Sequence, residues 1–254
     1  MTTLFMQSPG LVGATPLGVV SPPTAAELAV FALPGLVAWW RADIGFASLT
    51  SWVDRKTTRR LTLNSIAWPT VQASGIGAKP SLVFGPTTPL QDPDALAFIP
   101  LTGDFTVAGV AKPVAASNWA PWGINAPVAT STYLMRRSDE KFELRQNGVQ
   151  LAISAAAFGA ASPFYFVDSW EQAATQRVGR INGAQVAAVT TPQAVTNSTL
   201  LVGSGGSPSF AVGLAGELLS EIMVFSRPLA KASNAADLGT LEGYITGRYG
   251  AVFG

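Results

Sequence analysis

Short apolar runs, each closed by turn-forming residues, occupy most of the sequence from residue 35 onward. Runs of this length and composition are typical of β-strands, and the chain has no series of alternating strands and helices. This pattern predicts an all-β fold built as a two-sheet antiparallel β-sandwich. The expected strands cover residues 36–40, 49–53, 61–63, 81–84, 105–112, 132–136, 141–145, 163–170, 176–181, 184–189, 200–203 and a final strand within 213–229.

Asparagine-glycine pairs give the strongest local turn signals. Asn147-Gly148 and Asn182-Gly183 both favour the positive backbone angles of a two-residue hairpin turn. A further hairpin is expected across Ser138-Asp139, between the runs 132–136 and 141–145. These turns place consecutive strands next to each other in an antiparallel sheet.

A short helix is expected before the first strand and another after the last strand. Thr24 and Glu27 have the spacing of a capping box, which predicts a helix from Thr24 to about Ala32, stopping before Pro34. Near the other end, the amphipathic run 230–249 follows the last strand and predicts a closing helix. We therefore expect an N-terminal arm plus short helix over 1–34 and one β-sandwich domain over 35–254.

Charge is scarce, at 12% of the 254 residues against about a quarter in ordinary globular chains. The sixteen basic and fifteen acidic residues nearly cancel, which disfavours nucleic acid or an anionic membrane as a partner. The local exception is Arg55-Lys56-Thr57-Thr58-Arg59-Arg60. It lacks interleaved aromatic residues, so a solvated turn between strands is the better interpretation.

The sequence contains neither cysteine nor histidine. These absences exclude disulfides, thiolate metal ligands, thiol nucleophiles and any Ser-His-Asp triad. They also remove the commonest general base and the commonest metal ligand. We expect no metal, no cofactor and no enzymatic activity.

The first 23 residues form an apolar segment rich in Gly and Pro, without a helical or strand period. It has no positive charge ahead of an apolar core, so we expect no signal peptide, and no run is long enough for a transmembrane helix. We interpret it as an arm that becomes ordered against a partner protein; the alternative is an arm lying on its own domain. The apolar residues expected to dock are Leu4, Phe5, Met6, Leu11, Val12 and Leu17.

Seven segments, in order, resemble one family. They are Leu33-Pro-Gly-Leu-Val-Ala-Trp-Trp-Arg-Ala-Asp43, Leu49-Thr-Ser-Trp-Val-Asp54, Lys79-Pro-Ser-Leu-Val-Phe-Gly85, the strand 104–113, the Asn-Gly hairpin 179–186, Gly216–Leu229 and Leu241–Gly250. From residue 35 to 254 the chain thus resembles the concanavalin A-like lectin/glucanase superfamily, in particular laminin-G-like jelly-roll domains of phage and bacterial proteins. The resemblance implies a jelly-roll sandwich and a carbohydrate-binding surface.

Departures from the family pattern bear on metal binding and catalysis. The basic run 55–60 stands where relatives have an acidic loop, and Gly85-Pro-Thr-Thr-Pro89 stands where paired aspartates often occur, which argues against a calcium site. The glucanase branch uses alternate carboxylates on one strand, and the nearest match is Asp139, Lys141 and Glu143, with a lysine in the middle. We interpret this as a solvated hairpin. Glu217 and Glu221 are interpreted as structural ion-pair partners of Arg227 or Arg248.

Carbohydrate binding by this fold typically uses two features. Aromatic rings stack on the sugar rings, and polar side chains in the loops donate hydrogen bonds to them. Five residues are candidates for a carbohydrate-binding site: Trp119, Trp122 and Asn125 in the segment 115–130, expected to be irregular, together with Tyr133 and Arg137. The alternative is that the two tryptophans plug one end of the sandwich or pack on a neighbouring subunit.

Low charge, an apolar arm and a binding fold without catalytic residues favour a non-enzymatic structural or adhesive protein. We expect a phage virion component, such as a capsid decoration, head-fibre or tail-associated subunit, assembled in the host cytoplasm. Its partners would be other virion proteins through the arm and a host-surface glycan, and closed symmetry favours a homo-oligomer, with a trimer as one arrangement. The alternatives are a stand-alone carbohydrate-binding module or a glucanase-like glycoside hydrolase.

Overall fold

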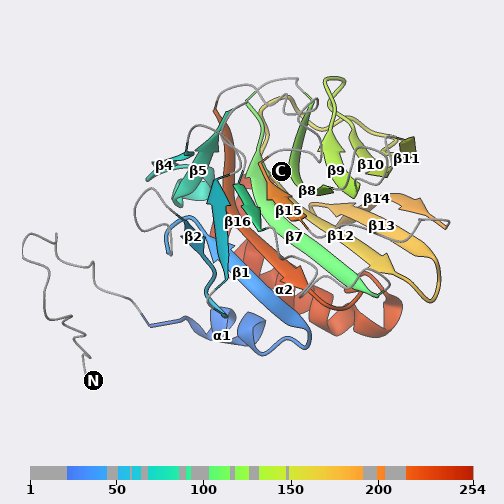
Figure 1. The fold of residues 1–254 in the computed structure, drawn as a ribbon, viewed down its shortest axis with the longest axis horizontal. Helices are drawn as coiled ribbons and strands as arrows, with labels where there is room; N and C mark the ends of the chain where they lie inside the picture. Colours follow the sequence, from blue (N-terminus) through green and yellow to red (C-terminus); the bar gives the residue numbers. More distant parts are fainter. Residues whose placement is uncertain are drawn as a thin grey trace, which may run out of the picture.

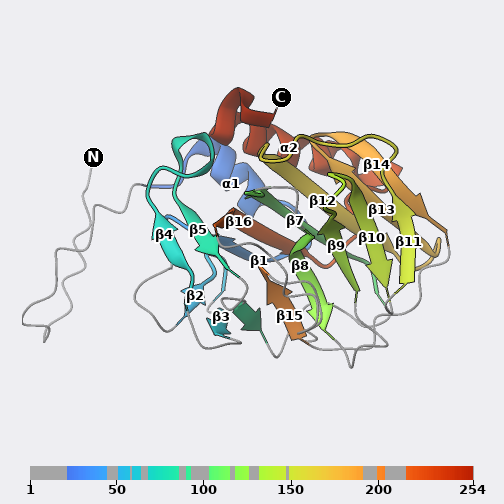
Figure 2. The ribbon, with the colours of Figure 1, turned by 90° about the horizontal axis from the view of Figure 1, so that it is seen from above.

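A computed structural model describes residues 22–44, 51–57, 59–63, 68–85, 90–92, 103–114, 118–125, 132–146, 149–190, 199–203 and 216–253. Two sequence predictions lie outside these residues: the docking arm, with Leu4, Phe5, Met6, Leu11, Val12 and Leu17, and the Asn147-Gly148 turn. The described parts form two antiparallel sheets packed face to face, with helices on one outer side (Figures 1 and 2). The prediction of an all-β sandwich with short terminal helices is confirmed.

The first sheet, which we call the helix-covered sheet, has the strand order β14-β13-β12-β7-β16-β5-β4, and β1 also pairs with β16. Its strands are β1 (Leu36–Arg41), β4 (Thr70–Gln72), β5 (Ser81–Phe84), β7 (Phe105–Lys112), β12 (Phe164–Glu171), β13 (Gln176–Ile181), β14 (Ala184–Val189) and β16 (Glu217–Phe225).

The second sheet, which we call the open sheet, has the order β11-β10-β9-β8-β15-β6-β3-β2. Its strands are β2 (Trp52–Val53), β3 (Arg60–Leu63), β6 (Leu90–Asp92), β8 (Trp119–Asn125), β9 (Thr132–Arg136), β10 (Phe142–Gln146), β11 (Val149–Ile153) and β15 (Thr199–Val202).

The helices lie on the outer side of the helix-covered sheet (Figure 2). Helix α1 (Ala25–Phe31) begins with the predicted capping box, in which Thr24 accepts from the Glu27 amide and Glu27 accepts from the Thr24 amide. Helix α2 (Ala235–Tyr249) follows the short helix η5 (Ala232–Asn234) and leads into η6 (Gly250–Phe253). A further short helix, η1 (Ile76–Ala78), lies between β4 and β5.

Strand β16 shows how the two hydrophobic cores are built. All nine of its residues are buried. Leu219, Ile222 and Val224 pack into the core between the sheets, whereas Met223 and Phe225 pack into the core beneath α1 and α2. The strand lies between β7 on one side and β1 and β5 on the other, so it is a central strand covered on both faces. Its nearly continuous apolar sequence follows from this position.

Strands β4, β6 and β11 are not among the strands expected from the sequence, and two further local features differ from the expectations. Residues 119–125 form strand β8 rather than irregular chain; Pro121 disfavours a strand, and a register shift between Trp119 and Trp122 accommodates it. Strict alternation along β1 would put Leu36 on the same face as Ala38 and Trp40, but Leu36 packs in the core under the helices while the other two face the opposite sheet. A bulge between Leu36 and Ala38 explains this change of face.

Candidate functional site

The two tryptophans proposed from the sequence as sugar platforms lie in the interior. Trp119 and Trp122 are 1% and 0% exposed and belong to the core between the sheets. The Trp119 indole donates to the Gly203 carbonyl at 3.3 Å, and Trp122 packs edge-on against Phe105. In this arrangement neither ring offers a face to a ligand, which agrees with the alternative that they fill the sandwich. Asn125 and Tyr133 lie on β8 and β9, and their side chains are outside the description.

Arg137 is the sequence candidate that lies in a polar, partly exposed environment. It follows β9 at the start of the turn to β10, and the predicted β9–β10 hairpin is present. Its Nη1 donates to Glu143 Oε2 at 2.9 Å and to Gln150 Oε1 at 3.1 Å, and its Nε donates to Asp139 Oδ1 at 3.0 Å. Three neighbouring segments of the open sheet thus meet at one guanidinium.

Glu143 is the centre of this group. Phe142 and Leu144 on the same strand pack into the core, so the intervening Glu143 projects from the opposite face of the sheet. Its side chain is 1% exposed, and Arg145 Nε lies 3.1 Å from Oε1 while Arg137 holds Oε2. We call Arg137, Asp139, Glu143, Arg145 and Gln150 the Arg137 cluster.

The ionisation of the cluster is set by these contacts. Hydrogen bonds to Glu143 and then Asp139 raise the pKa of Arg137. Burial tends to raise the pKa of Asp139, but the hydrogen bond from Arg137, the Lys141 amide and the nearby positive charges lower it overall. Two guanidinium groups and two carboxylates therefore form a charge-balanced group, in which Arg137 and Asp139 are partly exposed and Glu143 is buried.

A second charged cluster lies under the helices on the other side of the molecule. Arg41 pairs with Glu27 of α1 and with Asp43, and Arg248 of α2 donates to Asp43 Oδ2 at 2.7 Å. Arg55 lies 3.4 Å from Glu27. We call Glu27, Arg41, Asp43, Arg55 and Arg248 the Arg41 cluster. These contacts join α1, β1 and α2, which indicates a structural role.

The carboxylates of β16 are also buried. Glu221 Oε2 accepts from the Trp39 indole at 2.9 Å and from the Tyr244 hydroxyl at 3.0 Å. Glu217 accepts from the Val114 amide at 3.1 Å. The expected partner Arg227 instead pairs with Asp237, and Arg248 pairs with Asp43. The structural interpretation of both glutamates fits these contacts, with partners other than the two arginines.

The arginines of the basic run 55–60, which follows β2, contact other residues of the protein. The Arg55 guanidinium stacks on the rings of Phe31 and Trp39, at 5.0 and 4.5 Å from their centroids. Arg59 pairs with Asp92 at 3.1 Å, and Arg60 donates to Ser51 at 3.1 Å. Among the described residues, no group of three or more acidic, histidine or cysteine side chains could hold a metal ion.

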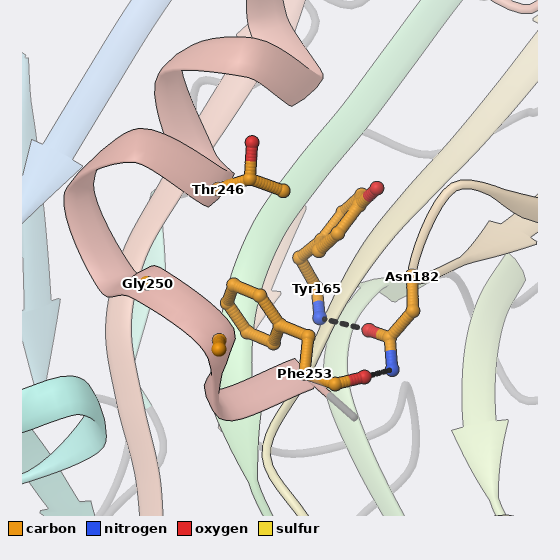
Figure 3. Close-up of a pocket in the computed structure, with 6 residues that line it drawn as sticks. Tyr165, Asn182, Thr246, Gly250 and Phe253 are labelled. Atoms are coloured by element: carbon orange, nitrogen blue, oxygen red, sulfur yellow. Dashed lines mark hydrogen bonds between the residues drawn. The ribbon is translucent and has the colours of Figure 1, made fainter.

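An open depression of about 540 Å³ lies between the β13–β14 turn and the C-terminal helices (Figure 3). Its polar side chains serve the fold: Asn182 accepts from the Tyr165 amide and donates to the Phe253 carbonyl, and Thr246 donates to the Glu242 carbonyl. Burial and the charge of Glu242 raise the pKa of Tyr165 to about 12. Asn182 and Gly183 have φ of 50° and 81°, which confirms the predicted turn. The Arg137 cluster is better equipped for polar recognition.

The fold defines the class of protein as an all-β sandwich, and solved structures with this fold match it. A Trypanosoma rangeli sialidase in complex with sialic acid matches with a TM-score of 0.58 and 13% identity over 85% of this chain and 34% of the sialidase. The chain therefore spans about a third of the sialidases it matches. No protein-family model matches the sequence, and no curated protein matches it.

Two further matches are to domains of other proteins. Domain 4 of AbnA, a GH43 extracellular arabinanase from Geobacillus stearothermophilus, in complex with arabinotriose, has a TM-score of 0.59 and 14% identity over 80% of this chain and 97% of that domain. The binding domain of Paraclostridial Mosquitocidal Protein 1 has a TM-score of 0.59 and 9% identity over 84% of this chain and 53% of that one. At these identities the likeness establishes the fold. No helix among the described residues is long and apolar enough to cross a membrane.

Proposed function

We propose that this chain is a non-enzymatic adhesive protein that binds carbohydrate through the Arg137 cluster on the open sheet. The observation that carries the proposal is the partly exposed Arg137, fixed at once by Asp139, Glu143 and Gln150. The match to nearly the whole of the arabinotriose-bound domain 4 of AbnA supports a binding module of this size.

The chemistry of the cluster suits a neutral sugar. Each sugar hydroxyl can both donate and accept, so it is recognised by donors and acceptors placed side by side. The Nη2 of Arg137 and the amide nitrogen of Gln150 donate to none of the described residues, and Asp139 supplies a carboxylate that is 45% exposed. Because the charges of Arg137 and Arg145 are balanced by those of Asp139 and Glu143, an anionic sugar gains no net attraction.

The same contacts favour binding without hydrolysis. A glycoside hydrolase requires one carboxylic acid with a raised pKa beside a second carboxylate. The pKa of Asp139 is instead lowered, chiefly by Arg137 against the opposing effect of burial, and Lys141 lies between Asp139 and Glu143 in the sequence. The carboxylate of Glu143 is ion-paired on both oxygens.

A glycan array followed by titration calorimetry tests the binding site. We expect saturable binding to neutral glycans, weakened at least about tenfold by Arg137→Ala, since hydrogen bonds to charged groups contribute roughly 1.5–3 kcal/mol. Arg180→Ala is the matched control, because Arg180 makes a 3.1 Å ion pair with Glu242 at a similar exposure beside α2. Absence of binding to every glycan, or equal loss in both variants, would contradict the proposal.

As the setting for this function we propose a phage virion, with residues 1–23 docking the protein onto the particle and a host-surface glycan as the target. The apolar, nearly uncharged composition of the arm supports docking, and low overall charge suits a closely packed assembly. We expect a homo-oligomer, with a trimer as one closed arrangement. Deletion of residues 1–23 should abolish incorporation into particles while leaving glycan binding unchanged; undiminished occupancy would show that the arm is not the anchor.

A further inference from the structure

Asp168 and Arg177 form a fully buried ion pair between the two sheets. Arg177 Nε and Nη2 donate to the two oxygens of Asp168 at 2.9 and 2.6 Å, and the side chains are 0% and 1% exposed. Phe166 and Trp170, which alternate with Asp168 along β12, pack into the core between the sheets. The pair therefore lies inside the sandwich.

Stability does not account for such a pair. Desolvation of two buried charges consumes most of their attraction, and apolar residues of similar volume often stabilise a protein equally or better. In some proteins buried charges instead fix one arrangement of the surrounding chain. The question is which arrangement Arg177 fixes.

Arg177 reaches across the interior to the strand that carries the Arg137 cluster. Its remaining terminal nitrogen, Nη1, donates to the carbonyl of Arg145 on β10 at 2.9 Å, and its guanidinium lies over the Trp122 ring of β8 at 5.9 Å. The β10–β11 register shifts between Leu144 and Arg145, so the bond is made where the ladder is irregular. Bulges of this kind re-aim the side chains that follow.

We propose that the Asp168–Arg177 pair is a positioning device for the carbohydrate site, and this inference rests on the proposed function. Arg177 fixes the backbone of Arg145 from inside the sandwich, while the Arg145 side chain on the outside contacts Glu143 at 3.1 Å. Glu143 in turn holds Arg137. Arg177 is a positioning residue, since it acts on the ligand-facing groups only through β10.

The test replaces the pair by apolar residues of similar volume, Asp168→Leu with Arg177→Met. We expect a melting temperature within a few degrees of the natural protein, hydrogen exchange of the 142–146 amides at least tenfold faster, and glycan affinity at least tenfold weaker. Exchange in β16 should stay unchanged. Arg180→Met with Glu242→Leu is the matched control, because Arg180 lies on the same strand and faces α2; neither readout should change.

Each outcome decides the inference. Unchanged exchange and affinity in a folded double variant would overturn it. Arg177→Lys, which keeps the charge but loses the forked geometry, is the second variant: faster exchange at 142–146 in a folded protein supports positioning, whereas unfolding of both variants would show that the pair stabilises the fold instead. If the natural protein binds no glycan, the proposed function fails, but exchange at β10 still reports whether Arg177 fixes that strand.

Discussion

Arg41 and Arg137 hold the same kind of position on opposite sides of the sandwich. Each guanidinium joins two carboxylates: Arg41 contacts Glu27 and Asp43, and Arg137 contacts Asp139 and Glu143. They differ in exposure, since the Arg41 side chain is 4% exposed and that of Arg137 is 33% exposed. Helices α1 and α2 cover the first, and no helix of the described chain packs over the second.

The difference shows how one chemistry serves two purposes. Under the helices, the arginines and carboxylates bind one another across α1, β1 and α2, and the interactions are used to hold those elements together. On the open sheet, the contacts fix the groups in place but leave donors and acceptors at the surface. Preorganised polar groups of this second kind can bind a ligand with little loss of side-chain entropy.

The largest expected effect on stability comes from disrupting the Arg41 cluster. Arg41→Ala should lower the free energy of unfolding by about 3–5 kcal/mol, because it leaves the buried Glu27 carboxylate without its nearest charge partner. Urea unfolding followed by fluorescence measures this. Lys231→Ala, which removes an ion pair that is 41% exposed at the lysine, should have a much smaller effect, because solvent screens an exposed pair. A similarly small loss of unfolding free energy in Arg41→Ala would mean that the Arg41 cluster does not join the helices to the sheet.

Asp43 makes the stability contributed by the Arg41 cluster depend on pH in the acid range. Burial would raise its pKa, but the hydrogen bond from Arg41 and the charges of Arg41 and Arg248 lower it below 3.8. A lowered folded-state pKa adds stability above the unfolded-state value and loses it as the pH falls through the folded-state value. Asp43→Asn should therefore cost about 1–3 kcal/mol at pH 7. This difference should remain constant down to about pH 5 and shrink below pH 3.8; a difference independent of pH to the end of the acid range would contradict it.

The fold was predictable because its determinants are local. The β9–β10 and β13–β14 hairpins, strand β7 and the capping box at Thr24 follow from apolar runs, turn residues and cap spacing that can be read within a few residues. Strand β8 could not be predicted in this way, because Pro121 and Gly123 disfavour a strand. It forms through its pairing with β9 and β15.

The candidate site was predictable only in part. Arg137 could be found as a polar residue beside a hairpin, but its meeting with Gln150 depends on how β11 adds to β10. Trp119 and Trp122 have the composition of a sugar platform, and only the face of β8 on which they lie shows that their rings are buried. The link from Arg177 to Arg145 joins residues 32 positions apart on different sheets, so no local pattern reports it.

The smallest expected effect on stability comes from disrupting the Arg137 cluster. Arg137→Ala should lower the free energy of unfolding by about 1 kcal/mol or less, since the side chain is partly exposed, water can replace its contacts, and Arg145 remains beside Glu143. The measurement is the same urea titration used for Arg41→Ala, so the two arginines are compared directly. A loss as large as that of Arg41→Ala would show that Arg137 is also a structural clamp. In that case its groups would be committed to the fold, and the reason for proposing a ligand on this face would disappear.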